Sequence, residues 1–163
     1  MIIIERVMSR TSDELLRGKE RDTLRLTWEE RRWNRKRALT RKGREVALAL
    51  PTGSILAAGD ILVVEPEWYL EVEPAPEPII AIFPRDRAEA LRVAFEVGNR
   101  HFSLALDGET LLVPDDGAME QLVARLGVPW ERREVPYEPI GSGAHRHGPG
   151  AGPLDGQAQV RAG

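Results

Sequence analysis

Residues 79–101 read IIAIFPRDRAEALRVAFEVGNRH, and this stretch decides the fold. Its first part, residues 79–83, is an unbroken apolar run typical of a buried strand. Asp86 is placed to cap a helix, and Glu89 follows at the spacing of a capping box. Gly98 stands where a left-handed C-terminal cap needs a residue without a β-carbon. The apolar residues that predict the buried face of this helix recur at helical spacing: Ala90, Leu91, Ala94 and Phe95.

The pattern continues with further strands and a second helix. The strands are expected at residues 79–83, 101–106, 110–113 and 130–135, with an Asp107-Gly108 hairpin turn between the middle two. The second helix opens around Asp115, Asp116 and Gly117, and its apolar stripe is Met119, Leu122, Val123 and Leu126. Strand, helix, strand, strand, helix, strand is the split βαβ order of ferredoxin-like domains, with both helices on one sheet face. The uncovered face predicts a partner surface, and a two-fold dimer is the commonest case.

The first part of the chain shows strand signals and almost no helix. Apolar or alternating runs between turn residues predict strands at residues 2–4, 23–27, 37–40, 45–50 and 61–64. Short strands at this spacing are typical of a small barrel or sandwich. The chain is therefore predicted to be an α+β protein whose N-terminal domain is rich in strands.

Proline and glycine divide the chain into three parts. Prolines at positions 74, 76 and 78 withhold amide donors, so we expect neither a helix nor a central strand to pass through them. After Gly141 the chain is rich in glycine, alanine and proline, which predicts a disordered tail. The predicted parts are a β-rich domain at residues 1–74, a ferredoxin-like domain at 75–139 and a flexible tail at 140–163.

Composition excludes several classes of protein. The 163-residue chain has a net charge of −3 and no cysteine, which excludes disulfides and thiolate metal sites. No apolar run approaches ~18 residues, so we expect no membrane segment and a soluble, cytoplasmic protein. Residues 28–37 combine arginines with Trp28 and Trp33, a pattern that also occurs in nucleic-acid contacts. The acidic balance elsewhere favours a solvated turn there, with no nucleic-acid partner.

His101 is the only histidine before the tail, which adds His145 and His147. On a strand that starts at residue 101, His101 and Phe102 point to opposite faces, so His101 looks away from the helix-covered core. One imidazole does not hold a metal ion alone. A residue near a two-fold axis meets its own copy, however, so one histidine per chain supplies two imidazoles to one ion. Imidazole suits nickel, copper and zinc alike, and water, a carboxylate or the tail histidines complete the ligands.

Five pieces of the sequence carry a resemblance to a known family. They are Leu26-Thr27-Trp28-Glu29-Glu30-Arg31, the run at residues 43–51, Ala75-Pro76-Glu77-Pro78, Gly98-Asn99-Arg100-His101 with Leu104-Ala105-Leu106 after it, and Pro136-Tyr137-Glu138-Pro139. Together, in this order and over most of the chain, they resemble UreE, the urease accessory nickel metallochaperone family.

The resemblance implies a β-rich domain for protein contacts, followed by a ferredoxin-like metal-binding domain and a tail. It implies a homodimer that binds Ni²⁺ between two copies of His101. Zn²⁺ and Cu²⁺ are further candidate ions because imidazole suits them as well. Delivery to the urease apoprotein, together with other urease accessory proteins, is the implied activity, and no enzyme is expected. Gly98, Asn99 and Arg100 are expected to support the site, since a protonated arginine repels cations and asparagine stabilises turns.

Two features depart from the family pattern. Many relatives carry a histidine before the second helix, where this chain has Gly117 after Asp115 and Asp116. Either aspartate is a candidate ligand for a hard or borderline ion, and helix capping is the alternative role. Family tails are often packed with histidines, whereas this tail offers only His145 and His147. About one ion per dimer is therefore expected rather than storage of many.

Two other functions stay open at this point. Acylphosphatases share the split βαβ layout and use an arginine with an asparagine to stabilise a phosphoryl transition state. Asn99 and Arg100 are the same residue types, but consecutive strand residues point to opposite faces. The second alternative is an adaptor protein that offers a sheet edge to an extended peptide and delivers no metal.

Overall fold

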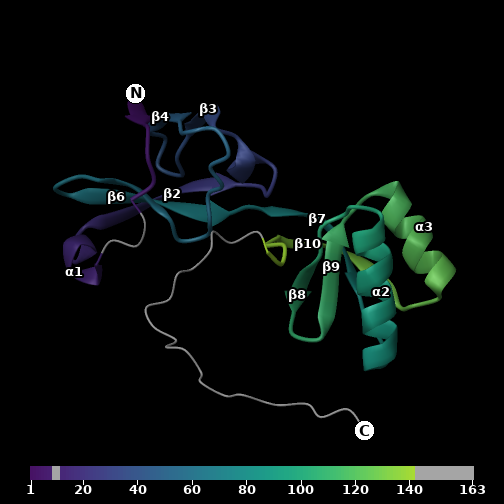
Figure 1. Cartoon of the computed structure of the whole chain (residues 1–163). Coiled ribbons are helices and arrows are strands. Elements are labelled where there is room, and N and C mark those ends of the chain that lie inside the picture. Colours follow the sequence, from purple (N-terminus) through teal and green to yellow (C-terminus); the bar gives the residue numbers. More distant parts are fainter. Residues whose placement is uncertain (9–11, 142–163) are drawn as a thin grey trace, which may run out of the picture.

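The computed structural model describes residues 1–8 and 12–141, which form a strand-rich α+β chain with few helices (Figure 1). Strands β1 to β6 make up an N-terminal unit, and strands β7 to β10 with helices α2 and α3 make up a C-terminal unit. Figure 1 shows β7 leading from the first unit into the second. Among the described residues, no helix combines the length and apolar character needed to cross a bilayer.

The N-terminal unit contains two three-stranded sheets, in the orders β1-β4-β3 and β2-β6-β5. The strands are β1 (Ile2–Ile4), β2 (Glu20–Leu26), β3 (Arg35–Leu39), β4 (Glu45–Ala49), β5 (Ile61–Val64) and β6 (Trp68–Pro74). The connections contain two short helices, α1 (Asp13–Leu16) and η1 (Glu30–Arg32). Within the described residues these strands form open sheets, so the predicted barrel alternative is wrong.

Aliphatic side chains from both sheets form the core of the N-terminal unit. The buried members are Ile4, Leu24, Leu26, Val46, Leu48, Leu50, Leu56, Leu62, Leu70 and Val72. Strand alternation places these residues on the inner faces, and charged residues alternate with them on the outer faces. On the outer side of the β2–β6 pair, Arg21 lies 2.6 Å from Glu71 and Arg25 lies 2.6 Å from Glu73.

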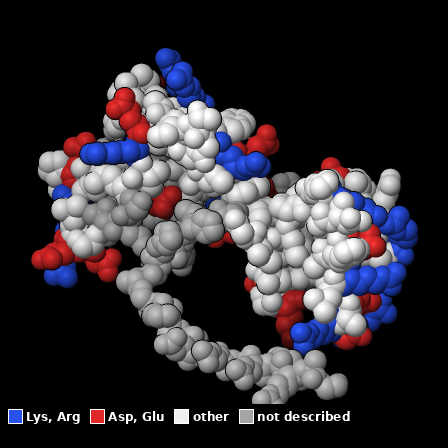
Figure 2. All heavy atoms as spheres, viewed as in Figure 1, with Lys and Arg blue, Asp and Glu red and all other residues white. Residues whose placement is uncertain are grey.

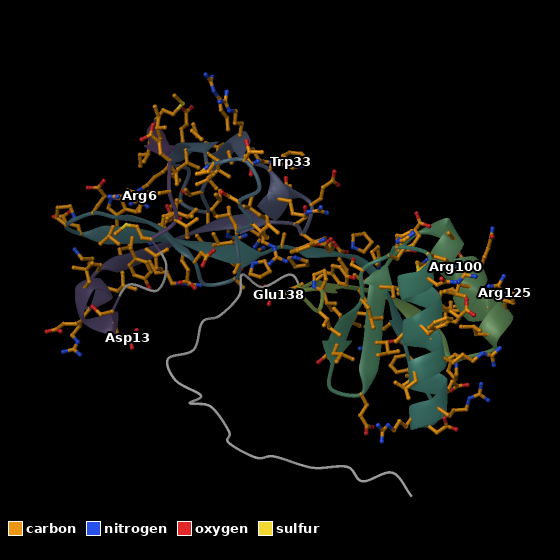
Figure 3. The ribbon with its side chains drawn as sticks, viewed as in Figure 1. Arg6, Asp13, Trp33, Arg100, Arg125 and Glu138 are labelled. Atoms are coloured by element: carbon orange, nitrogen blue, oxygen red, sulfur yellow. The ribbon has the colours of Figure 1, made fainter. Side chains whose placement is uncertain are left out.

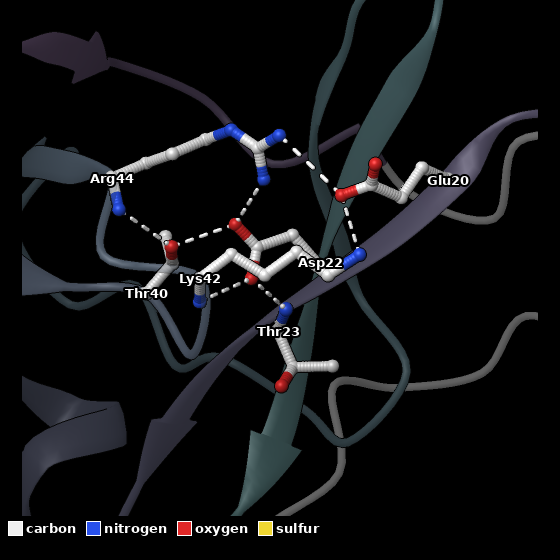
Figure 4. Close-up of polar contacts among 6 residues, drawn as sticks. All are labelled: Glu20, Asp22, Thr23, Thr40, Lys42 and Arg44. Carbon is white, nitrogen blue, oxygen red and sulfur yellow. Dashed lines mark hydrogen bonds and ion pairs between the residues drawn. The ribbon is translucent and has the colours of Figure 1, made fainter.

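Asp22 ties β2 to the hairpin between β3 and β4 (Figure 4). The residue is 1% exposed, and its carboxylate accepts hydrogen bonds from Thr40 Oγ1 at 2.6 Å and Arg44 Nη1 at 2.7 Å. The backbone N–H groups of Thr23 and Lys42 donate at 2.8 and 3.2 Å. Burial alone would raise the pKa of Asp22, but these hydrogen bonds hold it below its ordinary value. The buried charge is therefore fully partnered and links the two sheets.

Only Ala75 separates β6 from β7 (Pro76–Ile82). Strand β7 pairs with β10 along its whole length, but it pairs with β9 only from Ile79 to Ile82. The proline-containing part of β7 thus has one neighbouring strand, and a missing amide donor is tolerated at such an edge. Strand β7 thus begins within the proline segment but has a strand on both sides only from Ile79 onward, which agrees with the expectation that no central strand passes through the prolines.

The C-terminal unit is an antiparallel sheet in the order β10-β7-β9-β8, with both helices on one face (Figure 1). Its further elements are α2 (Arg87–Asn99), β8 (Ala105–Asp107), β9 (Thr110–Pro114), α3 (Gly117–Leu126) and β10 (Trp130–Pro136). They follow one another in the predicted order. The core between helices and sheet is Ile80, Ile82, Val93, Val97, Leu111, Val113, Met119, Leu122, Val123 and Val128.

The centre of the opposite sheet face is also covered. Ile79 and Ala81 are 0% exposed and Leu112 is 4% exposed. The side chains that pack with this cluster include Trp28 of the N-terminal unit and Tyr137, which follows β10. The expectation of an uncovered face open to a partner is therefore wrong for the centre of this sheet.

Candidate metal centre

His101 lies exposed in the turn that ends α2. Its backbone N–H donates to Gly98 O at 2.9 Å, and the N–H of Phe102 donates to Val97 O at 3.3 Å. These two bonds form a Schellman motif, with His101 at the left-handed position at φ 59°. Gly98 belongs to α2 itself. The prediction that Gly98 forms the left-handed cap is therefore wrong, because the helix continues past it.

The backbone conformation of His101 is costly for any residue with a β-carbon. A left-handed conformation costs roughly 1–2 kcal/mol for an L-residue, and glycine usually fills this position. Among the described residues, His101 is the only residue other than glycine with a positive φ. Residues in strained backbone conformations are found preferentially at functional sites when they are not glycine. The imidazole of His101 is therefore a candidate functional group.

Residues 101–104, called the His101 loop below, connect α2 to β8. Because β8 begins at Ala105, the predicted strand at 101–106 is wrong over these first residues. Phe102 packs against the helix-side core. Ser103 Oγ lies 2.9 Å from the Tyr137 hydroxyl, and Leu104 O accepts a hydrogen bond from Ile140 N at 2.7 Å. Each residue of the loop after His101 is thus held by a separate contact.

Arg100 is paired with a carboxylate on its own helix. Its Nη1 donates to Glu96 O at 2.8 Å and to Glu96 Oε2 at 2.5 Å, and Figure 3 shows Arg100 at the end of α2. The hydrogen bond from Arg100 holds the pKa of Glu96 below its ordinary value. Asn99 is the exposed last residue of α2. The positive charge next to His101 is therefore partly offset by Glu96.

Both aspartates before α3 already have partners. Asp116 Oδ1 accepts from Ala118 N at 2.7 Å and caps α3. Asp115 Oδ2 lies 3.2 Å from Arg132 Nε. In residues 1–8 and 12–141, no three His, Cys, Asp or Glu side chains gather as a metal site.

The tail histidines His145 and His147 lie outside the described residues. The chain before them passes the His101 loop, because Ile140 is hydrogen-bonded to Leu104. The tail therefore starts beside the loop that carries His101.

Leu91 and Phe95 form an exposed apolar pair on α2. They are 61% and 70% exposed, and their four-residue spacing puts them on one face of the helix. Val93 and Val97 fill the buried face instead. The prediction that Leu91 and Phe95 face the core is therefore wrong. This exposed apolar pair makes the outer face of α2 a candidate contact surface.

Sequence reasoning missed the contact between Arg31 and Tyr137. Arg31 is 2% exposed, and its guanidinium donates to Tyr137 O at 2.5 Å and to Glu138 Oε1 at 2.8 Å. It also lies 5.2 Å from the centre of the Trp28 ring. Figure 3 shows Glu138 between the two units. The solvated-turn prediction for residues 28–37 is therefore wrong at Arg31. The only sequence signal was that both segments belong to motifs of the family resemblance.

Charged side chains are mixed in sign over the surface in Figure 2. Lysine and arginine gather along the helical side of the C-terminal unit, with acidic residues between them. Arg125 lies near the end of α3 in Figure 3, and the charges of Arg125 and Arg92 add to the effect of Arg100 on Glu96. The positive charges on this surface thus act on the Glu96 carboxylate.

Sequence comparisons cover both units. Residues 3–75 match the UreE urease accessory protein N-terminal domain, and residues 77–159 match the C-terminal domain of the same family. The urease accessory protein UreE of Ralstonia nicotianae is 36% identical over 118 residues, which are 71% of this chain and 56% of the relative. The protein of the same name from Cupriavidus necator is 36% identical over 126 residues, 76% of this chain and 66% of the relative.

A third relative, UreE of Deinococcus radiodurans, is 38% identical over 112 residues, 69% of this chain and 72% of the relative. The chain spans less than two thirds of the Ralstonia and Cupriavidus proteins. The family consists of accessory proteins rather than enzymes, which confirms the prediction that the chain is not an enzyme. Because both of its units match, the chain belongs to the UreE family of urease accessory proteins.

Proposed function

We propose that two copies of this chain hold one Ni²⁺ between their His101 side chains and deliver it to the urease apoprotein. Other urease accessory proteins are the further partners. The supporting observation is His101 itself, an exposed imidazole kept on a strained turn. Imidazole also binds Zn²⁺ and Cu²⁺, and membership in a urease accessory family is what favours Ni²⁺ as the cargo.

In this proposal the homodimer brings a second copy of His101 to the ion. The described residues contain one histidine, and a two-fold axis near it brings a second imidazole to the same ion. Leu91 and Phe95 supply an apolar surface on the helix that ends at this turn. Burying each such side chain against a second copy stabilises the dimer by about 1.5–3 kcal/mol. The exposed face of α2 is therefore the proposed dimer surface.

The end of α2 also suits a cation electrostatically. The C-terminal end of a helix carries a partial negative charge, and a cation near it gains about 0.3–1 kcal/mol. The Glu96–Arg100 pair reduces repulsion from the neighbouring guanidinium. These contributions are small, so loading depends mainly on imidazole coordination.

His145 and His147 are proposed as additional, exchangeable ligands. His145 is five residues beyond Ile140, so a fully extended chain spans at most about 18 Å between them. Asp115 and Asp116 are weaker candidates, because ligation would break the ion pair with Arg132 or remove the α3 cap. Loss of such a cap costs about 0.5–2 kcal/mol.

The three parts of the chain have separate proposed roles. Residues 1–74 form a protein-interaction domain, and residues 75–139 form a ferredoxin-like metal-binding domain. Residues 140–163 bring the tail histidines to the site. The split βαβ element order and the His101 turn support the second assignment.

Native mass spectrometry and calorimetric titration with Ni²⁺ test the proposal. The full chain should bind about one ion per dimer, as one symmetric pair of imidazoles allows. His101→Ala should lose the tightest site and remain a folded dimer, whereas the control His145→Ala/His147→Ala should weaken binding only in part. Unchanged affinity in His101→Ala would contradict the site. A chain that retains no Ni²⁺, Zn²⁺ or Cu²⁺ in equilibrium dialysis would instead be the metal-free adaptor.

A further inference from the structure

The segment 137–140 lies between the N-terminal unit and the His101 loop and contacts both. On one side, Arg31 of η1 binds Tyr137 O and Glu138 Oε1. On the other side, the Tyr137 hydroxyl lies 2.9 Å from Ser103 Oγ, and Ile140 N donates to Leu104 O. The segment is thus a direct physical connection between the N-terminal unit and the loop that carries His101.

Tyr137 is the central residue of this connection. It is 1% exposed, and its ring packs with Ile79, Ala81 and Leu112 on the covered sheet face. Burial raises the pKa of Tyr137 to about 12, so the hydroxyl stays protonated under ordinary conditions. A buried hydroxyl needs a partner, and among the described residues Ser103 is its hydrogen-bond partner. Breaking this bond leaves a buried polar group without compensation.

Ser103 follows His101 by two residues, and the His101 loop lies before the first residue of β8. Two backbone hydrogen bonds to α2 hold His101 on the helix side, and the contacts of residues 102–104 hold the chain that leaves it. Phe102 is fixed by the core and Leu104 by the backbone of Ile140. The Ser103–Tyr137 bond is the one side-chain hydrogen bond described within this loop. Removing this hydrogen bond leaves Ser103 without its described side-chain partner, while Phe102 and Leu104 stay held.

Arg31 holds the backbone of Tyr137 in place from the N-terminal unit. Its side chain is 2% exposed, so the contact is shielded from water, and only one of its bonds goes to the half-exposed Glu138 carboxylate. Shielding strengthens hydrogen bonds to a charged group. The N-terminal unit thus holds the backbone of Tyr137 through Arg31.

We propose that Tyr137, held by Arg31 of the N-terminal unit, is a positioning residue that orients the His101 loop through Ser103. The proposal rests on the proposed role of His101 as a metal ligand. It adds that the N-terminal unit contributes to metal affinity without touching the metal. Outer groups that orient a ligand typically change metal affinity by about 10–100-fold when they are lost.

The experiment compares Ni²⁺ affinity among hydroxyl variants of the full chain. Tyr137→Phe and Ser103→Ala each remove one hydroxyl of the pair, Ser103→Thr keeps it, and Tyr69→Phe is the matched control in the other unit. Tyr137→Phe and Ser103→Ala should each weaken Ni²⁺ binding about 10-fold, the low end for an orienting group. The double variant should be no weaker than either single one, because both remove the same bond. Ser103→Thr and Tyr69→Phe should keep the affinity of the parent chain.

The absorption spectrum of the Cu²⁺-loaded protein gives a second readout. A changed imidazole orientation should shift the ligand-field band in Tyr137→Phe and Ser103→Ala, but not in Ser103→Thr. Far-ultraviolet circular dichroism shows whether each variant is folded. Full affinity and an unshifted band in Tyr137→Phe and Ser103→Ala, with binding still lost in His101→Ala, would overturn this proposal alone. Unchanged binding in His101→Ala would overturn the proposed function itself.

Discussion

At the scale of single residues, His101 meets two opposing demands. The Schellman turn favours glycine at its left-handed position, and the proposed metal ligation requires a side chain there. Histidine satisfies the second demand at the expense of the first. The strain is local, because the turn keeps both of its backbone hydrogen bonds. Stability and metal binding should therefore respond to substitution in opposite directions.

His101→Gly is expected to make the metal-free protein more stable by about 0.5–1 kcal/mol. Relief of ~1–2 kcal/mol of left-handed strain outweighs the ~0.5–1 kcal/mol lost to the larger unfolded-state entropy of glycine. Chemical denaturation measures the difference. The matched control is His101→Ala, which loses the imidazole but keeps the β-carbon and should gain nothing. Equal stability of the two variants would show that the turn is unstrained.

Asp22 should make the N-terminal unit sensitive to acid. Its pKa is lower in the folded chain than in the unfolded chain, so the unfolded chain takes up the proton first as the pH falls. The stability that Asp22 contributes is therefore fully present when the pH is above the ordinary carboxyl pKa of 3.8. It is lost as the pH falls through the lower pKa that Asp22 has in the folded chain.

Asp22→Asn is accordingly expected to be less stable at neutral pH and to lose less stability on acidification. Denaturant midpoints near neutral pH and at about pH 3 give the comparison, since the linkage acts between the two pKa values. Glu45→Gln, an exposed change on β4, is the control and should keep the acid sensitivity of the parent. If Asp22→Asn lost as much stability on acidification as the parent chain, other carboxylates would cause the acid sensitivity.

At the scale of elements, sequence patterns located helices and strands better than their faces and ends. The 3.6-residue period of α2 allows two choices for the face that packs on the sheet. One is Leu91 with Phe95, and the other is Val93 with Val97. The position of the sheet decides between them, and that position is absent from the local pattern. Strand β6 was missed because glutamates interrupt it at positions 71 and 73, and those glutamates pair with Arg21 and Arg25 across to β2.

The outer face of α2 should determine the oligomeric state. Leu91→Ser/Phe95→Ser is expected to convert the proposed dimer to a folded monomer, because both side chains are mostly exposed in one chain. Loss of two apolar contacts on each copy removes several kcal/mol, at about 1.5–3 kcal/mol per buried side chain. Sedimentation velocity measures the mass and circular dichroism measures the folding. Leu39→Ser, at 65% exposure on the N-terminal unit, is the control that should stay dimeric. A double variant that stays dimeric would place the interface elsewhere.

At the scale of the whole molecule, motifs far apart in the sequence meet at the junction of the two units. Arg31 reaches Tyr137 and Glu138, and Trp28 N donates to Glu77 Oε2 at 2.7 Å. Three of the five sequence motifs therefore share one contact region. The sequence could nominate His101, as the only histidine before the tail, and the order of elements around it. It could not show the left-handed turn or this junction, because both depend on contacts between distant residues.

Arg31→Met is expected to lower the free energy of unfolding by about 1–3 kcal/mol, the cost of leaving a buried carbonyl such as Tyr137 O without a donor. The loss stays below that of breaking a fully buried ion pair, because the Glu138 side chain is 52% exposed and regains water. Denaturant unfolding of the full chain measures the change. The exposed Arg37→Met is the matched control and should be within about 0.5 kcal/mol of the parent. If Arg31→Met also stayed within about 0.5 kcal/mol of the parent, other contacts would hold the two units together.

The hydrogen bond between Ile140 and Leu104 has a practical consequence for purification. A polyhistidine affinity tag added directly after Gly141 would begin beside the His101 loop and compete for the proposed Ni²⁺. Apparent stoichiometry would then count the tag along with the protein. Tagging at Met1, on the strand-rich N-terminal unit, starts the tag away from that loop and gives the cleaner preparation.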